Sequence, residues 1–230
     1  MARADSAIVV LQDVEMSDFR NTSRAEFAYE KLLTAIREQT LLPGDRIRED
    51  ELAKNLGISR TPLRQALHQL QARGLLQYAP GRGMIVAELS RQQVIDLYAT
   101  REILEGAAAR MAALRAGPAD IASMRDVLAA FSKAAPDAGK LARINRMFHA
   151  TVHEAAHNSY LSQTLNNFND TLALLKGTTF TIRGRWQREL AENTEVVDAI
   201  ERRDADAAEQ AARGNIREAL QVRLKVLFMA

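Results

Sequence analysis

The segment from Pro43 to Val86 constrains the fold more than any other part of the chain. Two short helical patterns follow its opening Pro-Gly turn and end at Gly57 and Gly74, because glycine readily takes the left-handed conformation that ends a helix. The second pattern, SRTPLRQALHQLQARG, has Ser59 as its candidate N-cap. The stretch LLQYAPGRGMIVAEL then contains two short strand patterns around a Pro-Gly turn. Helix, turn, helix and hairpin together predict a winged helix-turn-helix.

Charge is distributed unevenly along the 230 residues. The chain has a formal net charge of +2, but no Asp or Glu occurs between Leu52 and Ala87. The basic residues of the same stretch are Lys54, Arg60, Arg64, Arg73 and Arg82. After Glu88 the two signs are mixed. A locally basic segment in a nearly neutral chain indicates one anionic partner that is bound by one domain.

Polar and basic side chains gather at the start of the second helix of this pair. Ser59, Arg60, Thr61 and Arg64 all fall in or beside its first turn. The recognition helix of a helix-turn-helix enters the major groove with these N-terminal residues directed at base edges and phosphates. Arginine can donate two hydrogen bonds to guanine, and hydroxyls and the helix N-terminus suit phosphate. This pattern, with Arg82 at the hairpin tip, predicts a double-stranded DNA partner; the alternative is a solvated helix face.

The second half of the chain has almost no strand signals. Ser90 is a candidate cap for a long helix that ends near Arg115. Further helices are expected at 118–134, 139–157, 159–176, 186–203 and 205–228. We therefore expect a mainly α protein. Its expected parts are a flexible arm at 1–21, a winged helix-turn-helix at 22–88 that begins with a helix capped by Thr22 or Ser23, and an all-α helical bundle at 89–230.

Several classes of protein are disfavoured by what the sequence lacks. It contains no cysteine, so neither a disulfide framework nor a thiolate zinc site is possible. No apolar run approaches the roughly 20 residues that cross a bilayer, and no cleavage signature follows the first residues, so we expect a cytoplasmic protein without a membrane partner. No phosphate loop, dinucleotide fingerprint or G-x-S-x-G motif occurs, so we expect no enzymatic activity.

Three of the four histidines lie in FHATVHEAAHN, at His149, His153 and His157. Eight residues of helix rise about 12 Å, so the first and third cannot share an ion whose bonds are about 2 Å long. The apolar stripe of this helix consists of Leu141, Ile144, Phe148 and Val152. Relative to this stripe, His153 turns outward and His157 faces solvent. We therefore expect only Asn145 and His149 to point inward.

Polar residues also occupy the centres of the apolar stripes of other helices. Arg101, Asn193 and Asn215 each lie among apolar residues at helical spacing. A buried polar group is costly unless it is paired. Four helices that each direct such a group inward, Asn145 and His149 included, predict an internal polar cavity that binds a ligand. A self-satisfied structural network is the alternative.

The segment PGDRIREDELAKNLGISRTPLRQALHQLQARGLLQYAPGRGMIV resembles the DNA-binding domain of GntR-family bacterial transcription regulators. The elements PGD, ELA, LGISRTPLR and GLL, followed by a glycine-rich wing, match the family pattern. The residues that the resemblance implies to contact operator DNA are Arg60, Thr61 and Arg64 in the helix and Gly81, Arg82 and Gly83 in the wing. Asp50 departs from the pattern, because some members have a DNA-contacting arginine at this position.

The helical half resembles the FCD ligand-binding domain of the FadR branch of this family, on the motifs YATREILEGAAARMAA, NRMFH and AIERRDADAAEQAAR. Many FCD domains bind a divalent metal through an Asp and three His. The residues at those positions here are Asn145, His149, Asn193 and Asn215. Asparagine is a far weaker ligand for zinc or nickel than imidazole or carboxylate. We therefore expect a vestigial metal site and no cofactor.

Together the resemblances imply a homodimeric repressor that binds a pseudo-palindromic operator and responds to a small metabolite. Regulators of the FCD type commonly sense small carboxylates, so Arg101 is the candidate partner of such an effector. The expected effector-binding residues are Arg101, Asn145, His149, Asn193 and Asn215, with Thr178 and Arg183 at the entrance. The alternatives are a DNA-binding regulator without an effector and, more remotely, a helical metalloenzyme.

Overall fold

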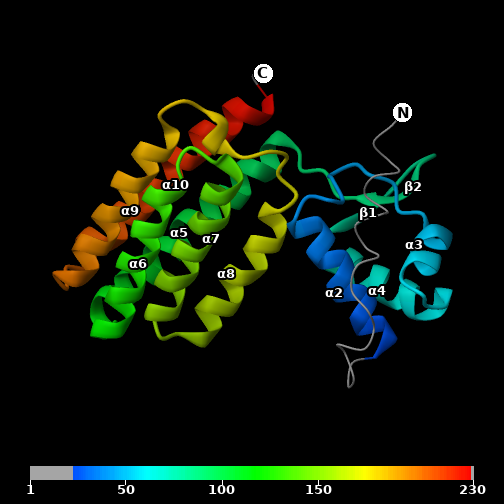
Figure 1. The fold of residues 1–230 in the computed structure, drawn as a ribbon, viewed down its shortest axis with the longest axis horizontal. Helices are drawn as coiled ribbons and strands as arrows, with labels where there is room; N and C mark the ends of the chain where they lie inside the picture. The colour runs from blue at the N-terminus through cyan, green and yellow to red at the C-terminus, as the bar shows by residue number, and fades with distance from the viewer. Residues whose placement is uncertain (1–22, 229–230) are drawn as a thin grey trace. The chain divides into compact units, whose positions relative to one another are not determined.

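The computed structural model describes residues 23–228, so the expected arm at 1–21 and Thr22 lie outside the described residues. The described chain divides into two compact units (Figure 1). The N-terminal unit comprises residues 23–89 together with 170–176, and the helical unit comprises 90–169 and 177–228. Each unit has a hydrophobic core of its own.

The N-terminal unit is the winged helix-turn-helix that the sequence predicts. Its elements are α2 (Arg24–Arg37), α3 (Glu49–Asn55), α4 (Arg60–Ala72), β1 (Leu76–Ala79) and β2 (Gly83–Val86). The Ser23 hydroxyl accepts a hydrogen bond from the backbone N–H of Glu26 and so caps α2. The two strands pair antiparallel, with Ala79 opposite Gly83 next to the turn, and form the wing.

The apolar face of α4 fixes this helix in the core. Its buried residues are Leu63, Ala66, Leu67 and Leu70, at the spacing that the sequence indicates. They pack with α2 in one core, and burial of each leucine side chain contributes about 1.5–3 kcal/mol. Because this face is buried, the opposite face and the first turn of α4 stay exposed. That orientation presents the candidate DNA-contacting residues.

The segment 170–176 completes the N-terminal unit. Leu174 is buried in its core, and the buried carboxylate of Asp170 accepts hydrogen bonds from Arg37 at 2.6 Å and from Arg73 at 2.5 Å. Two arginines thus neutralise a charge that would be costly to bury alone. The partners lie 133 and 97 residues apart in the sequence, so no local pattern indicates this grouping.

The helical unit is the all-α bundle that the sequence predicts, and Figure 1 shows its helices running alongside one another. Its elements are α5 (Arg91–Arg115), α6 (Pro118–Ala134), α7 (Ala138–Ala155), α8 (Ser159–Leu172, of which 159–169 belong to this unit), the short 3-10 helix η3 (Thr179–Thr181), α9 (Arg185–Glu201) and α10 (Ala205–Phe228). The helix expected at 159–176 ends earlier, at Leu172. None of the helices described is both long and apolar enough to span a membrane.

Small residues let the helices around α5 approach closely. This helix packs against α7, α9 and α10. Ala109 and Ala112 of α5 are fully buried in the main core with Ile200 of α9. A Cβ atom at Gly106 would lie 2.7 Å from the side chain of Arg213 in α10, so the crossing is tight at this glycine. Close packing of these four helices sets their inward polar side chains against one another.

Candidate nucleic-acid interface and buried polar site

The first turn of α4 presents the residues that the sequence assigns to DNA contact. Ser59, Arg60, Thr61 and Arg64 are all exposed. Ser59 is the N-cap, with an extended backbone, but its side chain makes no capping hydrogen bond to α4. The first N–H groups of a helix have no intrahelical partner, so they and this hydroxyl can bind an oxyanion. The turn therefore combines two guanidinium groups, two hydroxyls and backbone donors on one exposed surface.

Both arginines of this turn are paired with carboxylates of α3. Arg60 lies 2.9 Å from Asp50, and Arg64 donates a hydrogen bond to Glu49 at 2.7 Å. The hydrogen bond to Glu49 and the charge of that carboxylate raise the pKa of Arg64. Exposed ion pairs of this kind are weak, so a phosphate or a guanine can replace the carboxylate. The acidic run EDE at 49–51, directly before the basic segment, is the sequence signal for both pairs.

The wing turns at two glycines. Gly81 and Gly83 have φ angles of 72° and 76°, and a Cβ atom at either would meet no described atom within 4 Å. Glycine is therefore required here by backbone conformation and not by space. Arg82 between them is exposed and donates a hydrogen bond to the carbonyl oxygen of Gly44 at 2.6 Å. Tyr78 on β1 is exposed as well, so the wing carries a cation and an aromatic ring at its surface.

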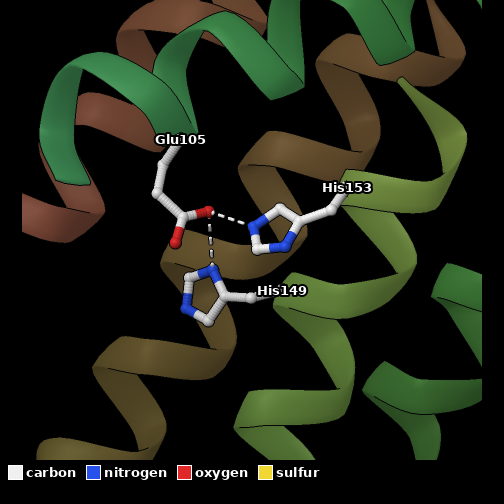
Figure 2. A group of neighbouring side chains, drawn as sticks. All are labelled: Glu105, His149 and His153. Carbon is white, nitrogen blue, oxygen red and sulfur yellow. Dashed lines mark hydrogen bonds and ion pairs between the residues drawn. The ribbon is translucent and has the colours of Figure 1, made fainter. Parts of the chain in front are cut away.

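In the helical unit a buried carboxylate, Glu105 of α5, meets two histidines of α7 (Figure 2). Its Oε2 atom lies 2.7 Å from Nε2 of His153 and 3.3 Å from Nδ1 of His149. The two rings come from successive turns of α7 and point at the same oxygen. The other oxygen, Oε1, accepts a hydrogen bond from Nη2 of Arg101 at 2.8 Å. One carboxylate therefore joins a guanidinium and two imidazoles in the interior.

The negative charge of Glu105 is stabilised by these neighbours. Burial alone would raise the pKa of this carboxyl, but His149, His153 and Arg101 together hold the pKa well below its ordinary value. Glu105 is therefore ionised at neutral pH. An ionised carboxylate in an interior site can accept hydrogen bonds or bind a cation.

The asparagines that the sequence places on inward faces form a chain of amides beside this site. Asn193 donates to Oδ1 of Asn145 at 3.0 Å, and Asn215 donates to Oδ1 of Asn193 at 3.2 Å. A small cavity is lined by Glu105, Phe148, His149, Val152, Asn193, Val196, Ala212 and Asn215. The centre of a water-sized sphere can occupy about 10 Å³ of it, which is room for about one water molecule or ion.

A second buried ionic group adjoins Asn215. Arg185 of α9 is buried and pairs with Glu189 and, at 3.1 Å, with Glu192. Nδ2 of Asn215 lies 3.1 Å from Glu189 and 3.2 Å from Glu192. Burial raises the pKa of Glu192, although the charge of Arg185 opposes that shift. The sequence signal for such a pair is two opposite charges four residues apart on an otherwise apolar helix face. Arg185 and Glu189 in α9 show this spacing, and so do Arg101 and Glu105 in α5.

The prediction that His153 turns outward is wrong. The residue is 2% exposed, because α5 brings Glu105 to that side of α7. The start of α8 lies there too, and the hydroxyl of Ser162 donates to the His153 carbonyl oxygen at 2.9 Å. Projection of a single helix assumes one buried face, whereas α7 is covered on more than one side. His157 is exposed beyond the end of α7, as predicted, and lies 3.0 Å from Asp120.

The residues expected at the entrance do not belong to the described cavity lining. The hydroxyl of Thr178 accepts a hydrogen bond from the backbone N–H of Phe180 and caps η3, and Arg183 is exposed. Arg101 bonds to Glu105, which lines the cavity, and does not line the cavity itself. The structure thus brings His149, Asn193 and Asn215 together around the cavity, and effector binding by the whole set stays a prediction.

The metal ligands that the family resemblance implies do not fit this chain. The amide oxygens of Asn145 and Asn193 already accept a hydrogen bond from a neighbouring amide, and a neutral amide is a poor ligand for zinc or nickel. Within residues 23–228, the group with metal-ligating atoms close together is Glu105, His149 and His153. Sequence reasoning missed Glu105 and set His153 aside.

Comparison with known proteins identifies the class of this chain. Residues 24–86 match the family described as bacterial regulatory proteins, gntR family, and residues 96–218 match the FCD domain. The first match covers the winged helix-turn-helix, and the second covers most of the helical bundle. The chain therefore belongs to the GntR family, in the group that carries an FCD domain. It is a DNA-binding transcription regulator and not an enzyme.

Relatives of known sequence or structure agree with this assignment. The chain is 28% identical over 185 residues to an uncharacterized HTH-type transcriptional regulator, YdhC, of Bacillus subtilis (strain 168), which covers 79% of this chain and 83% of that protein. It is 34% identical over 131 residues to the Nta operon transcriptional regulator of Aminobacter aminovorans, with 56% and 62% covered. The solved structure of E. coli McbR/YncC matches with a TM-score of 0.73 at 21% identity, over 90% of this chain and 98% of that chain, and shows the shared fold.

Proposed function

We propose that this regulator represses transcription by binding as a homodimer to a pseudo-palindromic operator, and that a small carboxylate-like effector in the helical unit changes its operator affinity. The observation that carries the proposal is the exposed first turn of α4, where two arginines and two hydroxyls surround a helix N-terminus. Binding to chromosomal DNA places the proposed activity in the cytoplasm.

The first turn of α4 is the proposed reader of the major groove. Arg60 and Arg64 carry planar guanidinium groups that can donate two parallel hydrogen bonds to guanine O6 and N7. Ser59 and Thr61 have hydroxyls beside the helix N-terminus, which suits a phosphate oxygen. When the operator binds, acceptor atoms of the DNA then replace the α3 carboxylates as partners of the two arginines.

The wing is the proposed minor-groove contact. Gly81 and Gly83 leave the tip without bulky side chains, and their positive φ angles set its direction. Arg82 between them is exposed and is held by a single backbone acceptor, Gly44. A narrow minor groove has an enhanced negative potential that attracts arginine, so Arg82 can exchange that acceptor for the groove.

Binding assays with substituted arginines test the DNA contacts. A genomic fragment recovered by binding selection serves as the operator, and its affinity is measured by fluorescence anisotropy. Arg60→Ala and Arg64→Ala should each weaken binding about tenfold to hundredfold, because each removes a base or phosphate contact. Arg91→Ala removes the same charge from the exposed start of α5 and should bind normally. Unchanged affinity in both α4 variants, with their circular dichroism intact, removes the recognition-helix assignment.

An exposed apolar stripe on α5 supports the proposed homodimer. Ile103 and Leu114 are 61% and 64% exposed. At about 100° per residue, side chains eleven positions apart point within about 20° of one another, so the two share one face of the helix. Exposed apolar side chains on one face of a helix can mark a subunit interface. A dimer would also supply two winged helix-turn-helix units, one for each half-site of an operator, and two half-sites are needed for specificity.

Sedimentation tests this interface directly. The double variant Ile103→Asp, Leu114→Asp should be monomeric at micromolar concentration and should lose operator affinity, because two charges would be buried between subunits. Met147→Asp is the matched control, since Met147 is 51% exposed on α7 and lies outside the stripe. A double variant that stays dimeric excludes this face, and a monomeric natural protein excludes the dimer.

The polar site of the helical unit is the proposed effector pocket. Its proposed contacts are Arg101, Asn145, His149, Asn193 and Asn215, with Thr178 and Arg183 at the entrance. Because Arg101 is paired with Glu105 and the cavity holds about one water molecule, an effector carboxylate has to separate the helices and take Arg101 from its partner. Such a ligand favours one conformation over another, and this difference in affinity is what couples an effector site to DNA binding.

The competing function is DNA-binding regulation without an effector. The observation in its favour is that the buried polar groups are paired with one another and leave little space. Thermal unfolding against a panel of small carboxylates separates the two functions, because a ligand of the native state raises the melting temperature. A carboxylate that raises it and also changes operator affinity supports the effector. No shift across the panel at millimolar concentration supports the alternative.

A further inference from the structure

Glu105 and His153 have no role in the DNA contacts or in the effector contacts proposed above, yet both are buried beside His149. We propose that these three side chains bind one divalent transition-metal ion such as zinc, through Oε2 of Glu105, Nδ1 of His149 and Nε2 of His153. The set differs from the one that the family resemblance implies, because the two share only His149. The proposal depends on neither the operator nor the effector.

The distances suit such an ion. Zinc binds imidazole nitrogen and carboxylate oxygen at about 2.0–2.2 Å, so two ligand atoms of a tetrahedral site lie about 3.4 Å apart. Oε2 of Glu105 is 2.7 Å from the His153 nitrogen and 3.3 Å from the His149 nitrogen, and all three ligand atoms lie within 4.8 Å of one another. Small rotations of the three side chains are therefore enough to place them around one ion.

The elements that carry the ligands, α5 and α7, pack against each other. His149 and His153 are four residues apart on α7, a spacing that directs both rings to the same side, and Glu105 projects from α5 toward both rings (Figure 2). Two imidazoles and one carboxylate leave the fourth position of a tetrahedral site open. Glu105 and His149 also line the cavity, whose space suits one water molecule in that position.

The surrounding groups prepare the ligands. Arg101 bonds to Oε1 of Glu105 and leaves Oε2 directed at the imidazoles, so Arg101 is a positioning residue. Nδ1 of His153 has no hydrogen-bond partner within residues 23–228. Nε2 of the same ring faces the ionised carboxylate of Glu105 at 2.7 Å and donates its proton there. An ion bound at Nε2 would replace that proton, which the unpartnered Nδ1 can take up. An ionised carboxylate and two neutral imidazoles are the forms that bind a metal.

Titration of the full chain with Zn²⁺ and Co²⁺ after removal of metal by a chelator tests the site. One equivalent should bind, and Co²⁺ should show the visible absorption of a four-coordinate ion. His153→Gln should weaken Zn²⁺ binding at least about a hundredfold, since even the loss of an outer-sphere partner costs 10–100-fold. His157→Gln, at the exposed histidine one turn further, should bind as the natural protein does.

Histidine side-chain ¹⁵N resonances of the unsubstituted protein give a second measurement that does not rely on a variant. Of the four histidines, His149 and His153 should shift on addition of one equivalent of Zn²⁺, while His68 and His157 should not. The proposal is overturned by absence of stoichiometric binding, by binding that survives His153→Gln, or by loss of binding in His157→Gln.

Discussion

Replacement of Glu105 by glutamine should be one of the most destabilising single changes in the helical unit. The change keeps the shape of the side chain but removes the charge that faces Arg101, and both residues are buried. Removal of one partner of a buried ion pair costs about 3–5 kcal/mol, because the other charge stays buried without compensation. The loss is a large fraction of the roughly 5–15 kcal/mol by which folded domains are stable.

Tryptophan fluorescence reports the unfolding of the helical unit, which contains Glu105. Trp186 is the single tryptophan of the chain, and it packs in α9 against a cluster that contains Phe131, Leu141 and Phe180. Its emission during urea unfolding therefore follows the helical unit. With an m-value near 2 kcal/mol per M, the expected loss lowers the unfolding midpoint by roughly 1.5–2.5 M.

Two further variants decide whether the buried pair is the cause. Glu201→Gln breaks an exposed pair with Arg125 and should cost less than about 1 kcal/mol. Arg101→Met combined with Glu105→Gln should regain part of the stability, because no charge is then left buried without a partner. A Glu105→Gln protein that is no less stable than Glu201→Gln, or a double variant that is weaker still, would refute the reasoning.

Other predictions concern pH, DNA affinity and the N-terminal unit. The pKa of Glu105 is lower in the folded state, so its contribution to stability is complete above about pH 4.5 and is lost as the pH falls below that value. The difference in unfolding free energy between the natural protein and Glu105→Gln should therefore shrink in urea titrations at acidic pH. A difference that stays constant with pH contradicts this. Glu49→Gln and Asp50→Asn should each tighten operator binding a few-fold in anisotropy assays. Arg64 or Arg60 then has no ion pair to break before it contacts DNA, and one carboxylate that repels the phosphates is removed. Weaker binding would show that the carboxylates position the arginines for DNA. Asp170→Asn should speed amide hydrogen exchange in the N-terminal unit, because two arginines lose a buried partner, and unchanged exchange argues against that role.

Patterns within one helix were sufficient for much of the fold. The buried face of α4, with Leu63, Leu67 and Leu70, follows from apolar spacing at the helical period, and Gly74 ends that helix with a positive φ angle. Arg101 and Asn215 are buried as well, because a polar residue at the centre of an apolar stripe is directed at the core. Each of these inferences needs only the residues of one element.

Pairing between elements could not be predicted in the same way. His153 lies outside the apolar stripe of α7, and only the position of α5 shows that Glu105 meets it there. Asp170 joins Arg37 and Arg73, which lie far from it in the sequence. In each case the partner is chosen by tertiary packing, so a projection of one helix shows where a side chain points but not what it contacts.

Selection of binding sites from random DNA tests the central claim most directly, namely that the first turn of α4 reads a two-fold-symmetric operator. The natural protein should enrich one motif with two inverted half-sites, and Arg91→Ala should enrich the same motif. Arg60→Ala should lose base preference at one position of each half-site, because a guanidinium contact specifies a single base there. The account is contradicted if the natural protein enriches no motif, or if Arg60→Ala and Arg64→Ala both select the unchanged one.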